Sequence, residues 1–156
     1  MKDLAAGEAP SKARLRLWLR LLRVTRGIEA DIRERLRRDH GTTLPRFDVM
    51  AALWRTPEGL KMSGLSGRLR VSNGNVTGIV ERLVSDGAVE RIPVPGDRRA
   101  MLVRLTPAGR AEFRTMAAEH ERWIDSLLGG IGAGEATAMA ETLRRIADTL
   151  DERTAT

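Results

Sequence analysis

Most hydrophobic residues of this chain recur at the three- and four-residue spacing of helices, and the clearest example lies between Val71 and Val84. Its apolar residues fall at positions i, i+3, i+4, i+7 and i+8, as expected for one buried helix face: Val76, Ile79, Val80, Leu83 and Val84. Ser72 stands where an N-cap residue is expected. The outer face carries short polar side chains and two glycines in place of the usual Glu and Lys: Asn73, Gly74, Asn75, Thr77 and Gly78. Small polar groups at a helix N-terminus suit close approach to a phosphate-bearing surface.

A long helix is expected near the N-terminus. Ser11 can cap it, and it runs to about Asp39 before Gly41 ends it. Its apolar residues occupy more than one stripe, so we expect the helix to bury two sides, one against its own domain and one against a partner subunit. Residues 1–10 are expected to form a flexible tail.

Two shorter helices lie between the long helix and the polar-faced one. Pro45, at a first helical position, starts a helix that extends to about Arg55. The next helix covers about residues 61–69 and contains two glycines. Residues 70–71 then form the turn into the polar-faced helix, which we expect to end at about Ser85.

After that helix, which Asp86 and Gly87 close, the spacing changes to that of β-strands. Residues 88–92 and 101–105 both predict strands, the second with period-2 alternation. The segment between them holds two prolines and a glycine, and it predicts a hairpin loop too long for a two-residue turn. This loop carries two adjacent arginines, Arg98 and Arg99.

Two helices close the chain. Thr106 followed by Pro107 marks the start of the first, which runs to about Leu128. It is expected to bury Phe113, Met116, Ala117, Trp123, Ile124 and Leu127. After a break at residues 129–130, the last helix covers about residues 134–151. It is expected to bury Ala138, Met139, Leu143, Ile146, Ala147 and Leu150.

This order of elements predicts a mainly α fold with a small β-hairpin wing. A short helix, a turn, a polar-faced helix and then a two-stranded hairpin with arginines at its tip form a winged helix-turn-helix. We expect a DNA-binding lobe over residues 45–105 and a helical dimerisation region over residues 11–40 and 106–156, in one continuous compact domain. The terminal helices carry apolar surface that needs a partner, and a second copy would supply it.

Composition narrows the setting of the protein. The chain has 156 residues and no cysteine, which excludes disulfides, a cysteine nucleophile, thiolate metal sites and thiol-based redox sensing. Its polar N-terminus is not a signal peptide, and no apolar run approaches the ~18 residues of a membrane span. We therefore expect a cytoplasmic protein with no membrane association, no metal and no cofactor.

The net charge of +6 is unevenly placed. Residues 11–40 hold ten basic against four acidic side chains, residues 45–104 hold ten against six, and residues 105–156 hold six against nine. Positive charge around the expected helix-turn-helix indicates a polyanionic partner. A general preference for arginine, which supplies all but three of the 27 basic residues, is the simpler alternative explanation.

In a winged helix-turn-helix the second helix enters the major groove of DNA, and the wing reaches the backbone or the adjacent minor groove. Asparagine can pair with adenine and threonine can contact the thymine methyl, so the polar helix face is suited to read base edges. Arg99 or Arg98 would enter the minor groove, with Asp97 holding a neighbouring guanidinium. The expected DNA contacts are Ser63, Arg68, Arg70, Ser72, Asn73, Asn75, Thr77, Arg82, Asp97, Arg98 and Arg99.

In these residues the chain resembles the MarR family of bacterial transcriptional regulators. The matching features are LPRFDVMAALW, SGLSGRLRVSNGNVTGIVERLVSDGAVER and GDRRAMLVRLTPAGR. The most specific part is Asp-x-Arg followed by a strand and Leu-Thr-x-x-Gly, here Asp97, Arg99, Leu105, Thr106 and Gly109. The resemblance covers nearly the whole chain. It implies an obligate homodimer with intertwined terminal helices that binds a palindromic operator in double-stranded DNA, commonly as a repressor released by a small molecule.

One position departs from the family pattern, and two other functions compete. Many members carry arginine after the recognition-helix threonine, where this chain has Gly78, so that contact cannot be transferred. An enzyme has little to work with, because His40 and His120 are the only histidines and no phosphate-binding glycine loop occurs. A winged helix used only for protein contact, without specific DNA binding, is the stronger alternative. The arginine pair and the basic front half of the chain argue against it.

The resemblance also implies an effector pocket where the DNA-binding lobe meets the dimer helices. Apolar and histidine side chains of those elements are candidates, beside an arginine strip that could hold a carboxylate or CoA phosphates: Trp18, Leu22, His40, Phe47, Met50, Trp54, Phe113 and Trp123, with Arg16, Arg20 and Arg23. Each of these residues is also explained as ordinary core or solvated surface. Three tryptophans in a chain without tyrosine favour an aromatic ligand, so we expect a small aromatic acid or its CoA thioester.

Overall fold

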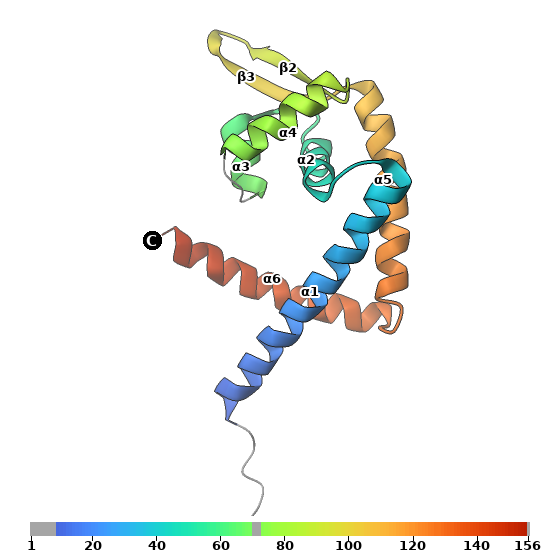
Figure 1. The fold of residues 1–156 in the computed structure, drawn as a ribbon. Coiled ribbons are helices and arrows are strands. Elements are labelled where there is room, and N and C mark those ends of the chain that lie inside the picture. The colour runs from blue at the N-terminus through green and yellow to red at the C-terminus, as the bar shows by residue number, and fades with distance from the viewer. Residues whose placement is uncertain (1–8, 70–72, 156) are drawn as a thin grey trace, which may run out of the picture. The chain divides into compact units, whose positions relative to one another are not determined.

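The computed structural model describes residues 9–69 and 73–155, and it is mainly helical with one small sheet (Figure 1). The elements follow one another as α1 (Pro10–His40), α2 (Leu44–Trp54), β1 (Leu60–Lys61), α3 (Met62–Leu69), α4 (Asn73–Ser85), β2 (Val89–Val94), β3 (Asp97–Leu105), α5 (Pro107–Leu127) and α6 (Ala133–Thr154). The chain forms two compact units, one that ends at His120 and one that begins at Glu121. The order α3, α4, β2, β3 is that of a winged helix-turn-helix, as the sequence predicts.

Helix α1 begins one residue earlier than expected. Pro10 is its first residue and Ala9 is the N-cap, with no side-chain hydrogen bond, so the predicted Ser11 cap is wrong. Proline suits this position because its fixed φ matches the first helical turn, where an N–H would be unpaired anyway. Gly41 ends the helix in a left-handed conformation with φ 59°, which confirms the predicted end.

Helix α2 is the centre of the core of the first unit. It begins at Leu44 and not at Pro45, because the Thr43 hydroxyl accepts a hydrogen bond from the Arg46 backbone N–H (3.3 Å) and caps the first turn. The apolar core gathers side chains from α1 to α5: Ile32, Leu36, Phe47, Val49, Met50, Leu53, Leu65, Val76, Val80, Leu83, Val89, Val103, Leu105, Phe113 and Met116. Of α1, only Ile32 and Leu36 are buried, so the expected two-sided burial of this helix is not reached within one chain.

A three-stranded antiparallel sheet in the order β1-β3-β2 forms the wing and its base. Strand β1 is missing from the sequence prediction, because two residues are too few to show a periodic pattern. Its residues Leu60 and Lys61 pair with Val103 and Leu102 of β3. The strand ties the segment before α3 to the hairpin, so the helix-turn-helix and the wing share one sheet.

The wing hairpin is longer and its turn tighter than the sequence predicts. Strand β2 extends to Val94 and pairs there with Asp97 of β3, so the expected loop over residues 93–100 is wrong. Only Pro95 and Gly96 remain in the turn, and Gly96 takes the left-handed φ of 82° that a turn needs at the position after proline. Prolines misled the sequence analysis because β2 is an edge strand, where a missing N–H is tolerated.

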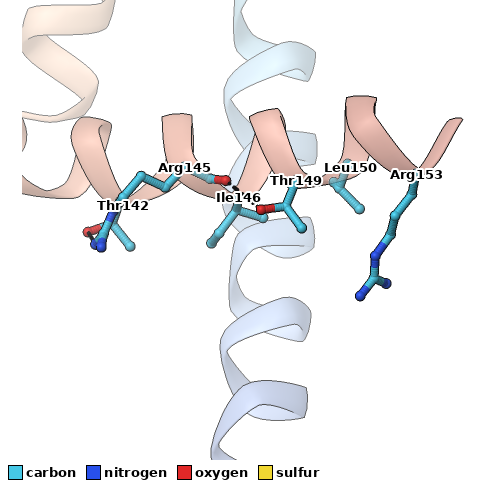
Figure 2. A pocket seen from close by; sticks show the side chains of 6 residues that line it. All are labelled: Thr142, Arg145, Ile146, Thr149, Leu150 and Arg153. Atoms are coloured by element: carbon cyan, nitrogen blue, oxygen red, sulfur yellow. Dashed lines mark hydrogen bonds between the residues drawn. The ribbon is translucent and has the colours of Figure 1, made fainter. Parts of the chain in front are cut away.

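The second unit contains the end of α5 and helix α6, which is longer at both ends than predicted. None of the α6 residues in the described part of the chain is buried, so the expected burial of its apolar face is wrong for a single chain. The side chains of Met139, Leu143, Ile146 and Leu150 are 42–53% exposed. Figure 2 shows that Ile146 and Leu150 share one side of the helix with polar neighbours: Thr142, Arg145, Thr149 and Arg153.

Candidate nucleic-acid interface

Helix α4 turns one face to the core and the opposite face to solvent. Val76, Val80 and Leu83 are at most 1% exposed and hold the helix from one side. Asn75 and Thr77 lie between these positions in the sequence and are exposed. The apolar face predicted from the spacing is confirmed for Val76, Val80 and Leu83, whereas Ile79 and Val84 are half-buried. Asn75 and Thr77 lie outside the buried face.

The predicted helix contacts fall partly inside the described structure. Exposed positions on α3 and α4 are taken by Ser63, Arg68, Asn75, Thr77 and Arg82. Arg70 and Ser72 lie outside the described residues, and so does the side chain of Asn73. Arg68 has a further role that the sequence did not reveal, because its Nη1 donates a hydrogen bond to Thr56 Oγ1 at 2.9 Å. This bond joins α3 to the turn after α2, and no local pattern marks it.

The tip of the wing presents two exposed arginines, Arg98 and Arg99, on β3. Asp97 Oδ1 accepts a hydrogen bond from the Arg99 backbone N–H at 3.0 Å. The carboxylate thus shapes the backbone of the tip, a role different from the predicted one of holding a guanidinium. The strand register shifts between Pro93 and Val94, and Arg98 and Arg99 fall in this irregular stretch.

The cations of this surface are not neutralised locally. In the ranges that the structure describes, Arg82, Arg98 and Arg99 form no ion pair. Closer to the base of the hairpin, by contrast, Arg104 Nε donates to Glu90 Oε1 at 2.7 Å, and these two residues are directly opposed in the register. Unpaired arginines beside a polar helix face attract a polyanion, because binding releases the counterions of the nucleic acid.

The Leu-Thr-x-x-Gly motif fastens α5 to the turn that follows α4. The Thr106 backbone N–H donates to the Ala88 carbonyl at 3.0 Å, and its hydroxyl donates to the Gly87 carbonyl at 2.6 Å. The same hydroxyl accepts from the Gly109 backbone N–H at 3.0 Å, which confirms Thr106 as a helix cap. A Cβ on Gly109 would lie 1.9 Å from the Ala88 oxygen. The motif therefore requires glycine for close approach of two backbones.

The candidate effector residues of the first unit include an aromatic cluster. The ring centroid of Phe113 lies 5.4 Å from that of Phe47 and 5.4 Å from that of Trp54. The ring of His120, which is not among the predicted effector residues, lies 4.9 Å from that of Phe47 between centroids, and burial lowers the pKa of its imidazole. Above the Trp54 ring stands the guanidinium of Arg110, at 4.3 Å from the ring centroid.

The remaining effector candidates have varied surroundings. Met50 is buried, Leu22 is half-buried, and Trp18 is 55% exposed on α1. The arginine strip is exposed as well: Arg16, Arg20 and Arg23. His40 Nε2 is hydrogen-bonded to Glu119 Oε2, which joins the end of α1 to α5. Trp123 is buried in the second unit. Among the candidates, the Phe113 ring thus lies against both Phe47 and Trp54.

Two general expectations can be compared with the described residues. Among residues 9–69 and 73–155, no group of three or more His, Asp or Glu side chains could hold a metal ion. No helix in those ranges is long and apolar enough to cross a bilayer.

A small hollow of about 100 Å³ lies between α2 and α4, lined by Pro45, Asp48, Val49, Leu69, Asn75 and Ile79. Burial, together with the nearby Glu29 carboxylate, raises the pKa of Asp48 at this hollow.

Known proteins share this geometry. The MarR family model matches residues 42–101, which span α2, the helix-turn-helix and most of the wing. The transcriptional activatory protein BadR of Rhodopseudomonas palustris is 30% identical over 129 residues, which are 81% of this chain and 69% of BadR. The solved structure of a MarR family transcriptional regulator from Silicibacter pomeroyi is 33% identical, with a TM-score of 0.74 over 92% of this chain and 99% of that one.

A third relative connects the fold to a ligand. The structure of Bordetella bronchiseptica BpsR, whose DNA binding is regulated by 6-hydroxynicotinic acid, is 28% identical to this chain. Its TM-score is 0.72 over 85% of this chain and 98% of BpsR. The likeness therefore extends from the helix-turn-helix to the flanking helices, as the sequence pattern predicts. This chain belongs to the MarR family of transcriptional regulators.

Proposed function

We propose that this protein acts as a homodimer that binds a palindromic operator in double-stranded DNA and represses transcription until a small aromatic acid or its CoA thioester releases it. One observation carries the proposal. The exposed polar face of α4 stands next to a wing whose tip arginines, Arg98 and Arg99, have no carboxylate partner in the described part of the chain. This combination suits a surface that reads bases while it neutralises phosphates.

In this proposal α4 lies in the major groove. Asn75 can bond an adenine edge bidentately and Thr77 can contact a thymine methyl. Arg98 or Arg99 enters the minor groove from the wing tip, where the negative potential favours arginine. Phosphate contacts come from cations, hydroxyls and one amide along the helix-turn-helix, with Ser63, Arg68, Arg70, Ser72, Asn73 and Arg82 as candidates.

The unpartnered apolar faces support the dimer. Leu15, Leu17, Trp18, Leu19 and Val24 of α1 are 49–57% exposed, and α6 leaves its own apolar stripe uncovered. A soluble monomer has no reason to leave so many large apolar side chains in water on two helices. A second copy would cover these helices through a two-fold interface and would present two winged lobes to half-sites about one helical turn apart.

The aromatic cluster supports the effector. It offers π surfaces next to the cationic Arg110, and Arg20 and Arg23 on α1 offer further exposed cations for a carboxylate or for CoA phosphates. BpsR, with the same fold and 28% identity, responds to 6-hydroxynicotinic acid, which is itself a small aromatic acid. We therefore propose that the aromatic ring of the effector contacts the Phe47, Trp54 and Phe113 region.

The DNA-binding part is tested with a duplex that the wild-type protein selects from a random library. Gel shifts at rising salt should show the affinity falling about 10³-fold between 50 and 200 mM salt, as expected for several phosphate contacts. Arg99→Ala should weaken binding on all sequences, whereas Asn75→Ala should mainly relax specificity. Binding that ignores salt would favour a protein-interaction module. Equal and small effects of the two substitutions would place the interface elsewhere.

The effector part is tested separately. Benzoic and nicotinic acids and their CoA thioesters are titrated against intrinsic tryptophan fluorescence and against operator release in the gel shift. A response in both signals is expected for at least one compound. No response in either would remove the effector and leave the DNA-binding proposal intact. A reporter under the selected operator determines the direction of regulation, which matters because the relative BadR is an activatory protein.

A further inference from the structure

The C-terminal end of α4 carries a residue that is poorly suited to its position. Asp86 follows Ser85, the last residue of the helix, and its backbone N–H donates to the Arg82 carbonyl at 2.9 Å. The free carbonyls at this end give a helix a partial negative charge, so a carboxylate here is repelled unless a cation lies close to it. A specific partner is therefore needed at this point.

Arg46 of α2 supplies that cation. Its Nη2 donates a hydrogen bond to Asp86 Oδ2. The Arg46 side chain is 24% exposed, and its Nε is buried without a hydrogen-bond partner in the described structure. The guanidinium thus depends on Asp86 for its charged contact. The backbone of Arg46 is itself fixed, because its N–H is bonded to the Thr43 hydroxyl.

We propose that the pair Arg46–Asp86 positions α4 for DNA binding by tying the end of this helix to the first turn of α2. The proposal rests on the proposed function. Helix α2 is a firm base, since Phe47, Val49 and Met50 next to Arg46 are all buried. Hydrophobic contacts fix the depth of α4 but are not directional, whereas a guanidinium–carboxylate contact is.

A small change of angle at the Asp86 end of α4 produces a large displacement at its other end. Asn75 lies eleven residues before Asp86, which corresponds to about 16 Å along a helix at 1.5 Å per residue. A tilt of about 5° at the tethered end would move the other end by roughly 1.4 Å, more than the ~0.5 Å within which a functional site must be held. Loss of the tether is therefore expected to impair base reading before it impairs folding.

The pair contributes little to stability. Asp86 is 53% exposed and Arg46 24% exposed, so water and salt screen the carboxylate side of the pair. Removing it should leave the melting temperature nearly unchanged. A loss of specific DNA binding without a loss of stability is the signature of a positioning role, and a merely structural role would change both together.

The test compares Asp86→Asn with Glu81→Gln. Each substitution removes one negative charge from the α4 region, but the described structure gives Glu81 neither a hydrogen bond nor an ion pair. Charge alone predicts tighter DNA binding for both variants. The tether predicts that Asp86→Asn binds the selected operator about tenfold more weakly than wild type. Its binding to a duplex of random sequence should stay equal or become tighter, and Glu81→Gln should weaken neither.

The charge swap completes the test. Arg46→Asp alone places two carboxylates together and should weaken operator binding, and the addition of Asp86→Arg should restore the affinity to within about threefold of wild type. The tether is overturned if Asp86→Asn binds the operator as tightly as wild type. It is also overturned if the double variant binds the operator no more tightly than Arg46→Asp alone. If the wild type itself shows no salt-dependent binding, the proposed function fails, and the tether fails with it. If the wild type binds and only the comparison of variants fails, the tether alone is wrong, so the two failures are distinguishable.

Discussion

Helices α4 and α6 look alike in the sequence and differ in the structure. Both carry an apolar stripe at helical spacing and both end in a polar loop or tail. In α4, Val80 and Leu83 are at most 1% exposed, whereas in α6 Leu143 and Ile146 are each 42% exposed. Periodicity thus predicts that a helix has an apolar face, but it does not predict whether the same chain covers that face.

The difference separates two kinds of stability. The winged lobe buries its stripe within one chain, so its stability should not depend on protein concentration. A helix whose stripe is uncovered gains its stability from whatever contacts it, and for a homodimer that gain depends on concentration by mass action. Substitutions in the two helices should therefore have different consequences.

The largest effect is expected in α4. Leu83→Ala removes a fully buried side chain and leaves a cavity, at a cost of about 2–5 kcal/mol in the free energy of unfolding. Urea denaturation at several protein concentrations should show the same loss at each of them. Leu128→Ala is the control, because Leu128 is 36% exposed. A loss below about 1 kcal/mol for Leu83→Ala would mean that the lobe relaxes around the cavity.

The next effect is expected in α6 and concerns association. Ile146→Glu places a charge in the apolar stripe and should raise the dimer dissociation constant about 100-fold, which corresponds to roughly 2.7 kcal/mol. Sedimentation at several concentrations measures it. Thr137→Glu is the matched control, since at about 100° per residue Thr137 lies on the opposite side of the helix. A variant that remains dimeric at every concentration would show that α6 is not the interface.

A smaller effect on stability is expected at Gly109, and the control substitution, at Gly67, should have the opposite sign. Gly109→Ala drives a Cβ against the Ala88 carbonyl, which is backbone and cannot rotate away, so we expect a loss of about 1–3 kcal/mol. Gly67 of α3 has no atom within 4 Å of an added Cβ, and Gly67→Ala should stabilise by up to about 1 kcal/mol. Thermal unfolding of both variants decides. Two variants of equal stability would mean that the backbone contact between α5 and the turn after α4 can relax to make room for the Cβ.

Features that depend on interactions between residues close in the sequence could be predicted, and features that depend on distant residues could not. The buried face of α4, the Gly41 end of α1 and the Thr106 cap were predictable, because each depends on residues within two helical turns. Bonds between distant segments, such as Arg68 to Thr56 and Arg46 to Asp86, leave no local pattern. The wing turn was mispredicted for a related reason. Whether Pro93 is compatible with a strand depends on its position at the edge of the sheet, which only the strand order reveals.

The smallest expected effect is a change in DNA affinity on substitution of Gly78. This residue lies outside the buried face of α4. An added Cβ there meets no atom within 4 Å, so Gly78→Arg is free of clashes in the protein itself. Arginine at this position should add one phosphate contact, steepen the salt dependence by about 0.9 per copy and tighten operator binding a few-fold. Gly78→Ala is the control for the gain in helix propensity, about 1 kcal/mol, which both variants share.

The sign of the Gly78→Arg effect distinguishes two arrangements of α4 on the DNA. A steeper salt dependence than that of Gly78→Ala would mean that the glycine leaves a gap between helix and DNA that a longer side chain can bridge. Weaker binding by both variants, with stability raised, would mean that the groove edge already fills this space and that the backbone of α4 approaches the DNA directly. In that case Gly78 would be as much a part of the reading surface as Asn75 and Thr77.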